Sequence, residues 1–522
     1  MMKSALMIDT KVFLFLKSYS GLGINRYFLL EQNELVEVDA QTIVNQTCYL
    51  ICHDYWLIAY SIFKEVGYLP CKIIDLDEFQ VIISGEKSER KARDTKDFTR
   101  RLNLENVDIE LNKAYMSIFN RSSDFNKEVY QKFAVFLSFY WEVLRAQAIE
   151  RDEMDRFLNI EVSVSNIMYQ AMAKGLLIDK VRLSEFKKEI DHDFFMALKS
   201  FSSKYDVPLE VPNDRDVIDY LEPQGVDCDN FDISYILRFV PLNNNYAPEL
   251  LELYKLNNTR MILNGITISQ ERIYPIADIF GSITSRIYLK DPSIQNISKK
   301  YRSLLKPNHG RKFIYIDYDQ YEVGIMAALS KDQELADLYA QPDMYEAIAV
   351  QLFSKEGKRK DAKKLFLSYS YGMKTKSLID AAYALGAERA KAKLVFKKFN
   401  QFEAWKETIQ KTFLANKKIG TVLGNYLRIS HENETLSEQE KRVAISQVVQ
   451  GTASLIFKKT LIEVSKIPDA QIILPMHDAI LLEVSFDFDE NQVVNIFKNV
   501  LSKHFNNEIV GKASLDNFFI NI

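Results

Sequence analysis

Two apolar segments, far apart in the chain, each carry an aspartate where a strand should end. Residues 471–484, QIILPMHDAILLEV, read as adjacent strands of a buried hairpin that meet at His477 and Asp478. Residues 311–329, RKFIYIDYDQYEVGIMAAL, read as a strand, a turn and a helix, with Asp317 near the strand's end. An ionised carboxylate beside such strands needs a charged partner or a metal ion. If both strands join one sheet the two carboxylates meet; the alternative is that Asp478 is an ordinary solvated turn residue.

Length and composition indicate a soluble protein of several domains. A chain of 522 residues is too long for one core and predicts three or four folding units. Apolar residues make up 47% and charged residues 26%, as in ordinary globular proteins. No apolar run approaches the length of a membrane span, so we expect no membrane contact and a cytoplasmic location. The four cysteines show no repeated spacing, which excludes a disulfide framework and a cysteine metal cluster.

Positive charge is concentrated locally although the net charge is −4. Residues 299–312, KKYRSLLKPNHGRK, carry six Lys or Arg and no acid, and residues 355–364, KEGKRKDAKK, are similar. Such clusters are usually solvated faces. Two clusters on either side of an acidic site would also suit the tracking of a phosphate backbone.

Changes of pattern along the chain predict an α/β region followed by a mixed region. Strand-like runs and short helices alternate in residues 1–85, and the charged segment 85–104 interrupts the pattern. The remaining expectations are mainly helix over 125–260 with one helix ending near Gly175, helix after 329 to about 415, a strand over 421–429 and a helix over 441–464.

One of these helices places cations at regular intervals. Arg359, Lys363, Leu367 and Tyr371 recur every fourth position and therefore lie along one helix face. Cations on such a face can reach a single triphosphate. The alternative is a basic solvated face with a buried tyrosine.

The motifs together resemble a known family. IDYDQYEVG, RKDAKKLFLSYSYG and MHDA, in this order, are similar to the three polymerase motifs of the family A (DNA polymerase I-like) DNA polymerases. SRIYLKDPSIQNI (285–297) and RVAISQVVQGTA (442–453) are similar to two further conserved stretches. The resemblance covers about 150–522. It implies a DNA-directed DNA polymerase, a nucleotidyltransferase that adds deoxyribonucleotides to a primer 3′ end.

The resemblance also implies a multidomain α+β and α/β architecture. A right-hand polymerase of palm, fingers and thumb would follow an RNase H-like, exonuclease-type α/β domain. The expected boundaries are the exonuclease-like domain at 1–150 and the polymerase at 151–522, with the thumb at about 180–265, the palm at about 266–330 and 430–522, and the fingers at about 331–429.

By match to the family's motifs, Asp317 and Asp478 are expected to bind two Mg²⁺ ions, or Mn²⁺ in their place, with help from the backbone carbonyl of Tyr318. Two divalent ions can activate a primer hydroxyl and neutralise a triphosphate. Glu322 matches the residue beneath the sugar that excludes a 2′-hydroxyl. The expected nucleotide-binding set is Arg359, Lys363, Leu367, Tyr371, Glu322 and Gln320.

The expected partners are primer-template DNA and deoxyribonucleoside triphosphates, and no particular protein partner is implied. Arg286 and Gln450 match positions that contact the duplex minor groove, whose acceptors are similar for every base pair. His477 matches a residue near the primer terminus, although it could equally be a packing residue. The expected DNA-binding set is Arg286, Gln295, Asn296, Arg442, Gln450 and His477.

Three positions depart from the family pattern and indicate a divergent branch, such as that of a phage, a plasmid or a specialised bacterial system, so the expected setting is a bacterial or phage-infected cell. Ala479 stands where the family usually has Glu, and Gly324 replaces a usual Arg. Leu367 replaces an aromatic residue near the sugar, which puts discrimination at the 3′ position in doubt. None of the three removes an expected metal ligand.

The amino-terminal region is expected to be a vestigial exonuclease without proofreading activity. The family's Asp-x-Glu motif would fall at Asp9, but Lys11 stands in place of the Glu. Asp54 is out of phase with the second motif. The last motif, Tyr-x-x-x-Asp, would fall at Tyr130 with Ala134 in place of the Asp.

Two alternatives to a replicative or repair polymerase stay open. One is a polymerase-like DNA-binding accessory protein without catalysis, although Asp317, Asp478, Arg359 and Lys363 are all present. The other is a specialised polymerase that copies RNA templates, bypasses lesions or serves in defence.

Overall fold

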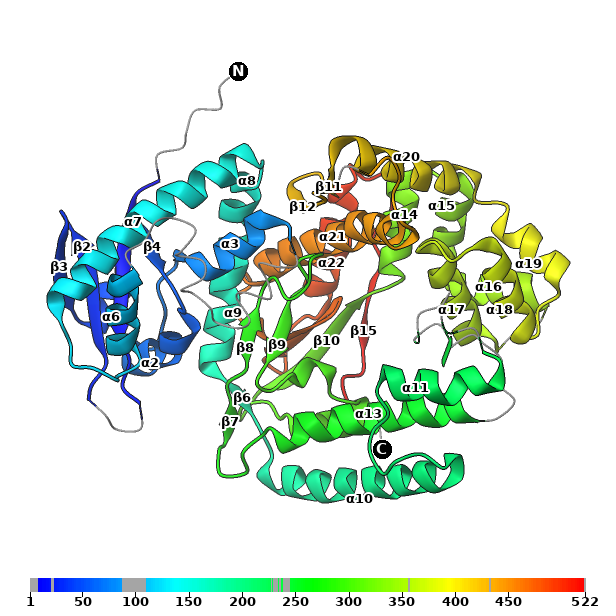
Figure 1. Cartoon of the computed structure of the whole chain (residues 1–522), viewed down its shortest axis with the longest axis horizontal. Helices are drawn as coiled ribbons and strands as arrows, with labels where there is room; N and C mark the ends of the chain where they lie inside the picture. The colour runs from blue at the N-terminus through cyan, green and yellow to red at the C-terminus, as the bar shows by residue number, and fades with distance from the viewer. Residues whose placement is uncertain are drawn as a thin grey trace.

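A computed structural model gives the arrangement of the chain (Figure 1). The structure describes residues 8–19, 23–86, 109–226, 245–354, 357–430 and 433–520, with the isolated positions 228, 233, 236 and 237. Nearly all of the charged segment expected at 85–104 lies outside the described residues. Within the described ranges, no helix is both long and apolar enough to cross a bilayer.

The amino-terminal region is a five-stranded mixed sheet with helices packed on it, as its α/β pattern predicts. The strand order is β3-β2-β1-β4-β5, in which β1 pairs parallel with β4 and antiparallel with β2. The longest helix of the region, α7, runs beside the sheet (Figure 1). The elements are β1 Thr10–Leu16, β2 Arg26–Glu31, β3 Glu34–Val38, α1 Ala40–Val44, β4 Tyr49–Cys52, α2 Trp56–Val66, β5 Ile73–Asp75, α3 Leu76–Ser84, α6 Ile109–Phe119 and α7 Lys127–Glu150.

A helical segment follows, as predicted, although small strands interrupt it. α9 ends at Lys174 because Gly175 takes a positive φ of 72°. α10 and α13 pack lengthwise against each other, and with α11 they enclose a separate hydrophobic core. The elements are α8 Met154–Arg156, a π-helical segment Phe157–Glu161, α9 Val162–Lys174, β6 Leu176–Leu177, α10 Lys180–Tyr205, α11 Asp214–Leu221, α13 Tyr246–Asn264, β7 Arg272–Ile273, β8 Ile276–Asp278 and β9 Tyr288–Lys290.

The two aspartate-bearing segments do join one sheet, as the sequence predicts. The central antiparallel sheet has the order β13-β14-β10-β15, and Asp317 is in register with Ala479. Met476 pairs with Ala479, so His477 and Asp478 form a two-residue turn. His477 has a φ of 59°, the positive value that such short hairpin turns require. The strands are β10 Lys312–Tyr318, β13 Gln471–Met476, β14 Ala479–Val484 and β15 Ala513–Asp516.

A group of helices follows β10 and lies on the opposite side of the central sheet from the amino-terminal region (Figure 1). This confirms the helical expectation up to residue 416. The helices are α14 Tyr321–Ser330, α15 Gln333–Ala340, α16 Met344–Phe353, α17 Arg359–Ser370, α18 Thr375–Ala384, α19 Arg389–Phe396 and α20 Asn400–Asn416.

The single strand expected over 421–429 is wrong, because this stretch belongs to a hairpin. β11 is Lys418–Thr421 and β12 is Gly424–Arg428, and they pair antiparallel with Thr421 opposite Gly424. Gly424 has a φ of 111°, a conformation that glycine adopts easily and other residues resist. The chain therefore reverses where the sequence pattern reads as continuous.

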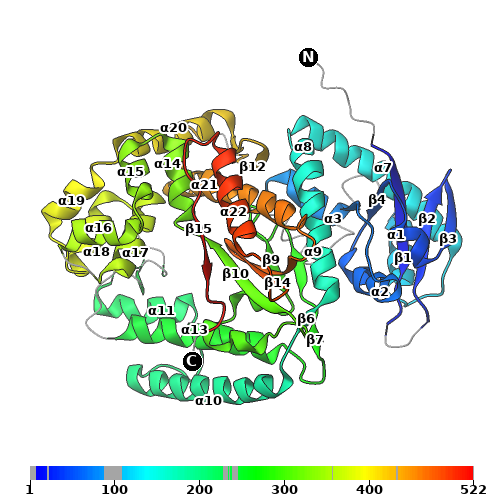
Figure 2. The same ribbon diagram turned by 180° about the vertical axis from the view of Figure 1, so that it is seen from behind.

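Two long helices complete the centre of the molecule. α21 Glu438–Val464 begins at a capping box between Ser437 and Glu440, and buried residues occur all around it. It contacts α9, α14, β11 and α22. α22 Asn491–His504 packs against β10 and β15, on the face seen in Figure 2. One hydrophobic core runs from the amino-terminal sheet through the central sheet to the helices beyond it.

Gly324, one of the departures from the family pattern, lies in α14 against the ring of Tyr339. A Cβ added at Gly324 would stand 2.7 Å from that ring, which is closer than van der Waals contact allows. The room that a larger residue would need is therefore filled by Tyr339. Gly324 and Tyr339 therefore pack together, because the missing side chain at position 324 leaves room for the tyrosine ring.

Gly324→Ala is expected to lower the free energy of unfolding by about 1–3 kcal/mol, the usual cost of overpacking a core. Urea unfolding followed by circular dichroism measures it. The matched background is Tyr339→Leu, in which the ring is gone and the same Gly324→Ala change should cost far less. An equal cost in both backgrounds would show that the contact with Tyr339 is not the cause.

Candidate active site

Asp317 and Asp478 lie at the same end of two adjacent strands. Asp317 is the penultimate residue of β10, and Asp478 directly precedes β14. The amide of Tyr318 lies 3.5 Å from the carbonyl oxygen of Asp478, so the two backbones are in contact where the carboxylates branch off. The pairing of β10 with β14 thus places side by side two acids that are 161 residues apart in the sequence.

The Asp317 carboxylate stands among like charges. Burial is the largest cause that raises its pKa, to about 7, and the negative charges of Asp478, Asp319 and Asp516 raise it further. Asp319 follows on the same segment and accepts a hydrogen bond from Ser514, while Asp516 lies on β15. The negative charge around Asp317 is therefore not balanced by the neighbouring groups of the protein.

Asp478 has a mixed electrostatic environment. Burial raises its pKa to about 6, and the charge of Glu322 adds to the increase. Arg286 and Lys363 act in the opposite direction. Two cations and a further carboxylate are therefore close enough to Asp478 for their charges to act on it.

Glu322 links three separate segments through its two carboxylate oxygens. Arg286 donates to one oxygen at 2.6 Å and the hydroxyl of Tyr371 donates to the other at 2.5 Å. Gln450 on α21 lies close enough to the Tyr371 hydroxyl to act on its pKa. This cluster joins the loop before β9 to α14, α17 and α21 and fixes the side chain of Glu322.

The cations of α17 flank one aromatic ring. Arg359 lies with its guanidinium 5.6 Å from the ring centre of Tyr345, and the Lys363 ammonium lies 5.4 Å from the same ring. Arg359 also forms an ion pair with Asp343 at 2.5 Å. The side chain of Leu367, one turn further on, is half-buried. The expected common face therefore exists, with one of its cations already paired.

Tyr318 and Gln320 shape the turn between β10 and α14. The Tyr318 ring is buried, its hydroxyl lies 2.6 Å from that of Thr460, and it stacks on Tyr321. Gln320 takes a φ of 53°, and its amide bonds the carbonyl of Pro342 and the amide of Met344. Gln320 thereby ties the end of β10 to the start of α16.

The remaining expected DNA-binding residues differ in exposure. Gln295 is only 3% exposed and accepts a hydrogen bond from the amide of Leu289, so its side chain serves the interior here. Asn296 and His477 are exposed. Although His477 reaches solvent, partial burial of its ring lowers its pKa, and the positive charges of Arg286 and Arg302 lower it further. Arg442 is half-buried, with its side chain beside Gly372.

Sequence reasoning missed Asp319 and Asp516 as part of the acidic group. Asp319 alternates with Asp317 in IDYDQ, and this spacing of two was an available signal. Asp516 gave no signal, because only the pairing of β15 with β10 brings it near.

The exonuclease-motif candidates of the amino-terminal region have separate partners in the structure. Lys11 pairs with Glu31 at 2.7 Å, the Tyr130 hydroxyl lies 3.5 Å from the carbonyl oxygen of Phe15, and Ala134 is fully buried. Asp54, the candidate that is out of phase with the second motif, has a carboxylate oxygen within 4.8 Å of possible ligand atoms of His53 and Asp77. Asp54 and Asp77 line a pocket of about 460 Å³ against Asp278 and Lys290 of the central region.

Comparison with known proteins shows which family this chain resembles. Residues 244–514, more than half of the chain, match the family model described as DNA polymerase family A. DNA polymerase I of Borreliella burgdorferi is 25% identical over 467 residues, which is 79% of this chain and 48% of that protein. DNA polymerase theta of Caenorhabditis elegans is 28% identical over 275 residues, which is 49% of this chain and 17% of that protein.

A solved structure shares the fold over nearly the whole chain. The POL domain of Pol1 from M. smegmatis, in complex with DNA primer-template and dNTP, superposes with a TM-score of 0.69 at 16% identity. The match covers 94% of this chain and 91% of that one. The chain spans about half the length, or less, of the curated relatives described above. The matched family model and the shared architecture show that this chain belongs to DNA polymerase family A.

Proposed function

We propose that this protein carries out template-directed DNA synthesis and adds deoxyribonucleotides to the 3′ end of a primer. The observation that carries the proposal is the convergence of Asp317 and Asp478 beside Lys363 of α17 and the Arg286–Glu322–Tyr371 cluster. The bound primer-template and dNTP of the M. smegmatis protein support the same substrates here. The curated relatives are named DNA polymerases, which supports the same reaction.

The regions divide the work as in a right-hand polymerase. The proposed palm, about 266–330 and 430–522, holds the central sheet and both aspartates. The proposed fingers, about 331–429, carry α17. The proposed thumb, about 180–265, contains the long α10–α13 pair with its own core, which suits it to move against the rest.

The acidic group fits divalent metal ions. Carboxylate and carbonyl oxygens are the ligands that Mg²⁺ prefers, and Asp317, Asp478 and the carbonyl of Tyr318 form such a set. Burial raises the pKa of Asp317 to about 7 and the neighbouring carboxylates raise it further, and a bound dication would relieve this repulsion. When bound, two such ions activate the primer hydroxyl and stabilise charge on the departing diphosphate. Mn²⁺ offers the same coordination chemistry and is proposed as a substitute.

The residues of α17 and α14 position the incoming nucleotide. Lys363, whose charge acts on Asp478, would bind the triphosphate as a point charge. Arg359 would release the carboxylate of Asp343 and bind a phosphate of the nucleotide in its place. Both groups are oxyanions that accept hydrogen bonds from a guanidinium. Glu322, held from two sides, would form the steric barrier to a 2′-hydroxyl, with Gln320 and Leu367 shaping the pocket.

The duplex would lie along the Arg286 side of the site. Arg286 and Gln450 both contact the Glu322–Tyr371 pair and would reach the minor groove at the primer end. Asn296, Arg442 and His477 are proposed as further contacts, whereas the buried Gln295 would act indirectly, by holding the backbone of β9 at Leu289.

The amino-terminal domain, residues 1–150, is proposed to be a scaffold without proofreading activity. A two-metal exonuclease needs several carboxylates that converge on the ions. Asp9 has Lys11 two residues away, and that ammonium is engaged by Glu31. Ala134 supplies no ligand. The apolar core shared with the central region explains why such a domain persists, because its loss would expose that core.

Asp317→Ala and Asp478→Ala are each expected to abolish primer extension while primer-template affinity stays close to that of the parent, because duplex affinity comes mainly from cation–phosphate contacts. Extension of a labelled primer with Mg²⁺ and all four dNTPs, together with fluorescence anisotropy, measures both. Asp487→Ala, an exposed aspartate after β14, is the matched control. Substantial extension by either site variant would remove the site assignment, and an inactive parent would favour the accessory-protein alternative.

Asp317→Asn is expected to stabilise the metal-free protein at neutral and alkaline pH but not at pH 4. The pKa of Asp317 rises from 3.8 to about 7 on folding, so the folded state holds the proton more tightly than the unfolded state. The parent therefore loses stability as pH rises from about 4 to 7, whereas the variant keeps a neutral side chain throughout.

Thermal melts in EDTA at pH 4 to 8 test this prediction. The variant's advantage in Tm should grow over that window to a few degrees, on the order expected for 1–2 kcal/mol. Asp487→Asn provides the surface control. A constant offset at every pH would show that burial and repulsion do not act on Asp317 as argued.

No 3′ shortening is expected when the protein and Mg²⁺ are incubated with an end-labelled, mismatched primer-template without nucleotides. Gel electrophoresis over several hours measures the primer length. Shortening that survives Asp478→Ala but disappears in Asp9→Ala or Asp54→Ala would show that the amino-terminal domain is an active exonuclease.

A further inference from the structure

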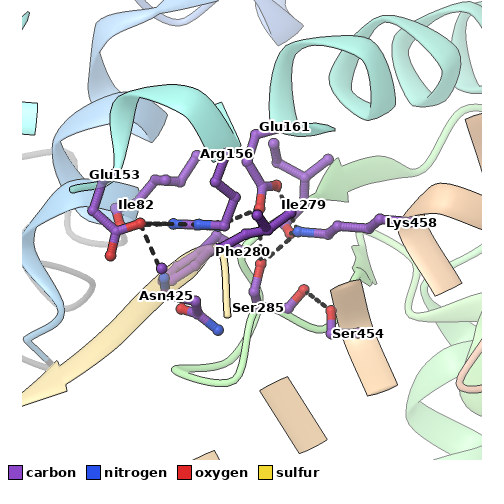
Figure 3. Close-up of polar contacts among 12 residues, drawn as sticks. Ile82, Glu153, Arg156, Glu161, Ile279, Phe280, Ser285, Asn425, Ser454 and Lys458 are labelled. Atoms are coloured by element: carbon purple, nitrogen blue, oxygen red, sulfur yellow. Dashed lines mark hydrogen bonds and ion pairs between the residues drawn. The ribbon is translucent and has the colours of Figure 1, made fainter. Parts of the chain in front are cut away.

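Four fully buried charges form a neutral cluster between the amino-terminal region and the centre of the molecule (Figure 3). Glu153, Arg156, Glu161 and Lys458 are each 1–2% exposed. Arg156 donates to Glu153 at 2.9 Å and also to Glu161, and Lys458 donates to Glu161 at 2.6 Å. Two cations and two carboxylates balance, which makes burial of all four tolerable.

The cluster holds backbone as well as side chains. The two oxygens of Glu153 accept the amides of Asn425 and Tyr426, both at 3.0 Å, and so fix β12. Arg156 donates to the carbonyl of Ile82 at 3.3 Å. Three segments that are remote in sequence are thereby fastened at one point.

Lys458 uses all three of its donor positions inside the protein. Besides Glu161, its ammonium donates to the carbonyl of Ile279 at 2.8 Å and to the hydroxyl of Ser285 at 2.5 Å. An ammonium has three donors and no acceptor, so its hydrogen-bonding capacity is filled. The cluster therefore reaches from α21 directly to the loop that precedes Arg286.

Ser285 holds a backbone conformation that its residue type disfavours. Its φ is 63°, in the left-handed region where any side chain with a Cβ is strained. The Ser285 hydroxyl accepts the bond from Lys458 and lies 3.3 Å from a carboxylate oxygen of Glu161. The Ser285 carbonyl accepts a hydrogen bond from the hydroxyl of Ser454. A strained residue persists where surrounding contacts over-determine it, and strain of this kind clusters at functional sites.

The conformation of Ser285 sets the direction of the next residue. Arg286 leaves the loop toward the candidate active site, donates to Glu322 and lowers the pKa of Asp478. A change of φ at Ser285 would swing the Cα–Cβ direction of Arg286 and break this contact.

We propose that Lys458 is a positioning residue of the polymerase site, which holds Ser285 in its left-handed conformation and thereby aims Arg286 at Glu322 and the primer end. This inference rests on the proposed function. Lys458 itself does not touch the reacting groups; it acts through the backbone of Ser285. A purely structural role for the same lysine would stabilise the fold without favouring Arg286 over any other residue.

Lys458→Met tests the positioning role, because methionine fills the space but donates no hydrogen bond. The rate of primer extension should fall by roughly tenfold or more, the effect of losing one hydrogen bond to a charged group. Adding Ser285→Gly should recover most of the lost rate of primer extension, since glycine adopts a positive φ without strain. Lys459→Met, the same change at the next position of α21 where the ammonium faces His504, should leave extension at the parental rate.

A double-mutant cycle separates action through Arg286 from general destabilisation. If Lys458 acts through Arg286, then Lys458→Met should cost little in an Arg286→Ala background, whereas independent effects would multiply. If Lys458→Met alone does not fold, the charge-balanced pair Lys458→Met with Glu161→Gln takes its place in every arm. Thermal melts on each variant report stability separately from rate.

The outcomes are distinct. Rescue by Ser285→Gly together with a non-additive cycle supports the proposal. Unchanged extension in Lys458→Met, absence of rescue, or an additive cycle overturns it. If the parent itself extends no primer, the proposed function fails, and the positioning role is then decided by a crystal structure of Lys458→Met: a left-handed Ser285 with Arg286 still on Glu322 would refute it, and a rearranged loop would support it.

Discussion

The antiparallel pairing of β10 with β14 is the constraint on which the rest of the structure depends. Its register sets Asp317 opposite Ala479 and so beside Asp478. Because side chains alternate across a strand, a slip by one residue would move Asp317 to the opposite face, among the buried Ile314, Ile316 and Tyr318. The alternation of the apolar side chains therefore fixes the position of the acids as firmly as any contact the acids make themselves.

The site departs from the electrostatic balance that the rest of the interior keeps. Burial raises the pKa of Asp317 to about 7, and among the described residues the charges that act most on it are carboxylates, which raise it further. Ala479, buried at the position where the family usually has Glu, adds no further negative charge to this pair. The proposed metal binding requires this imbalance, since a site already neutralised by its own side chains would have little affinity for cations.

How much the sequence predicted depends on how local each feature is. Short-range periodicity predicted the hairpin of residues 471–484, the turn between β10 and α14 and the common face of α17. The structure confirms all three. The β11–β12 turn was misread because a single glycine reverses an otherwise strand-like run. Asp516 and the cluster around Lys458 could not be predicted, because their partners meet only through tertiary packing: Lys458 and Glu161 are 297 residues apart.

The neutral cluster and the acidic site are best understood together. Repulsion among the site's carboxylates favours any rearrangement that spreads them apart, so the surrounding backbone must be held by contacts that do not themselves depend on the site's charge state. Glu153, Arg156, Glu161 and Lys458 provide such contacts, since their charges cancel and water does not reach them. Lys458 connects this cluster to Ser285, the residue directly before Arg286. On this proposal, the paired charges of the neutral cluster hold the backbone beside the site. The carboxylates of the site itself remain available for cations.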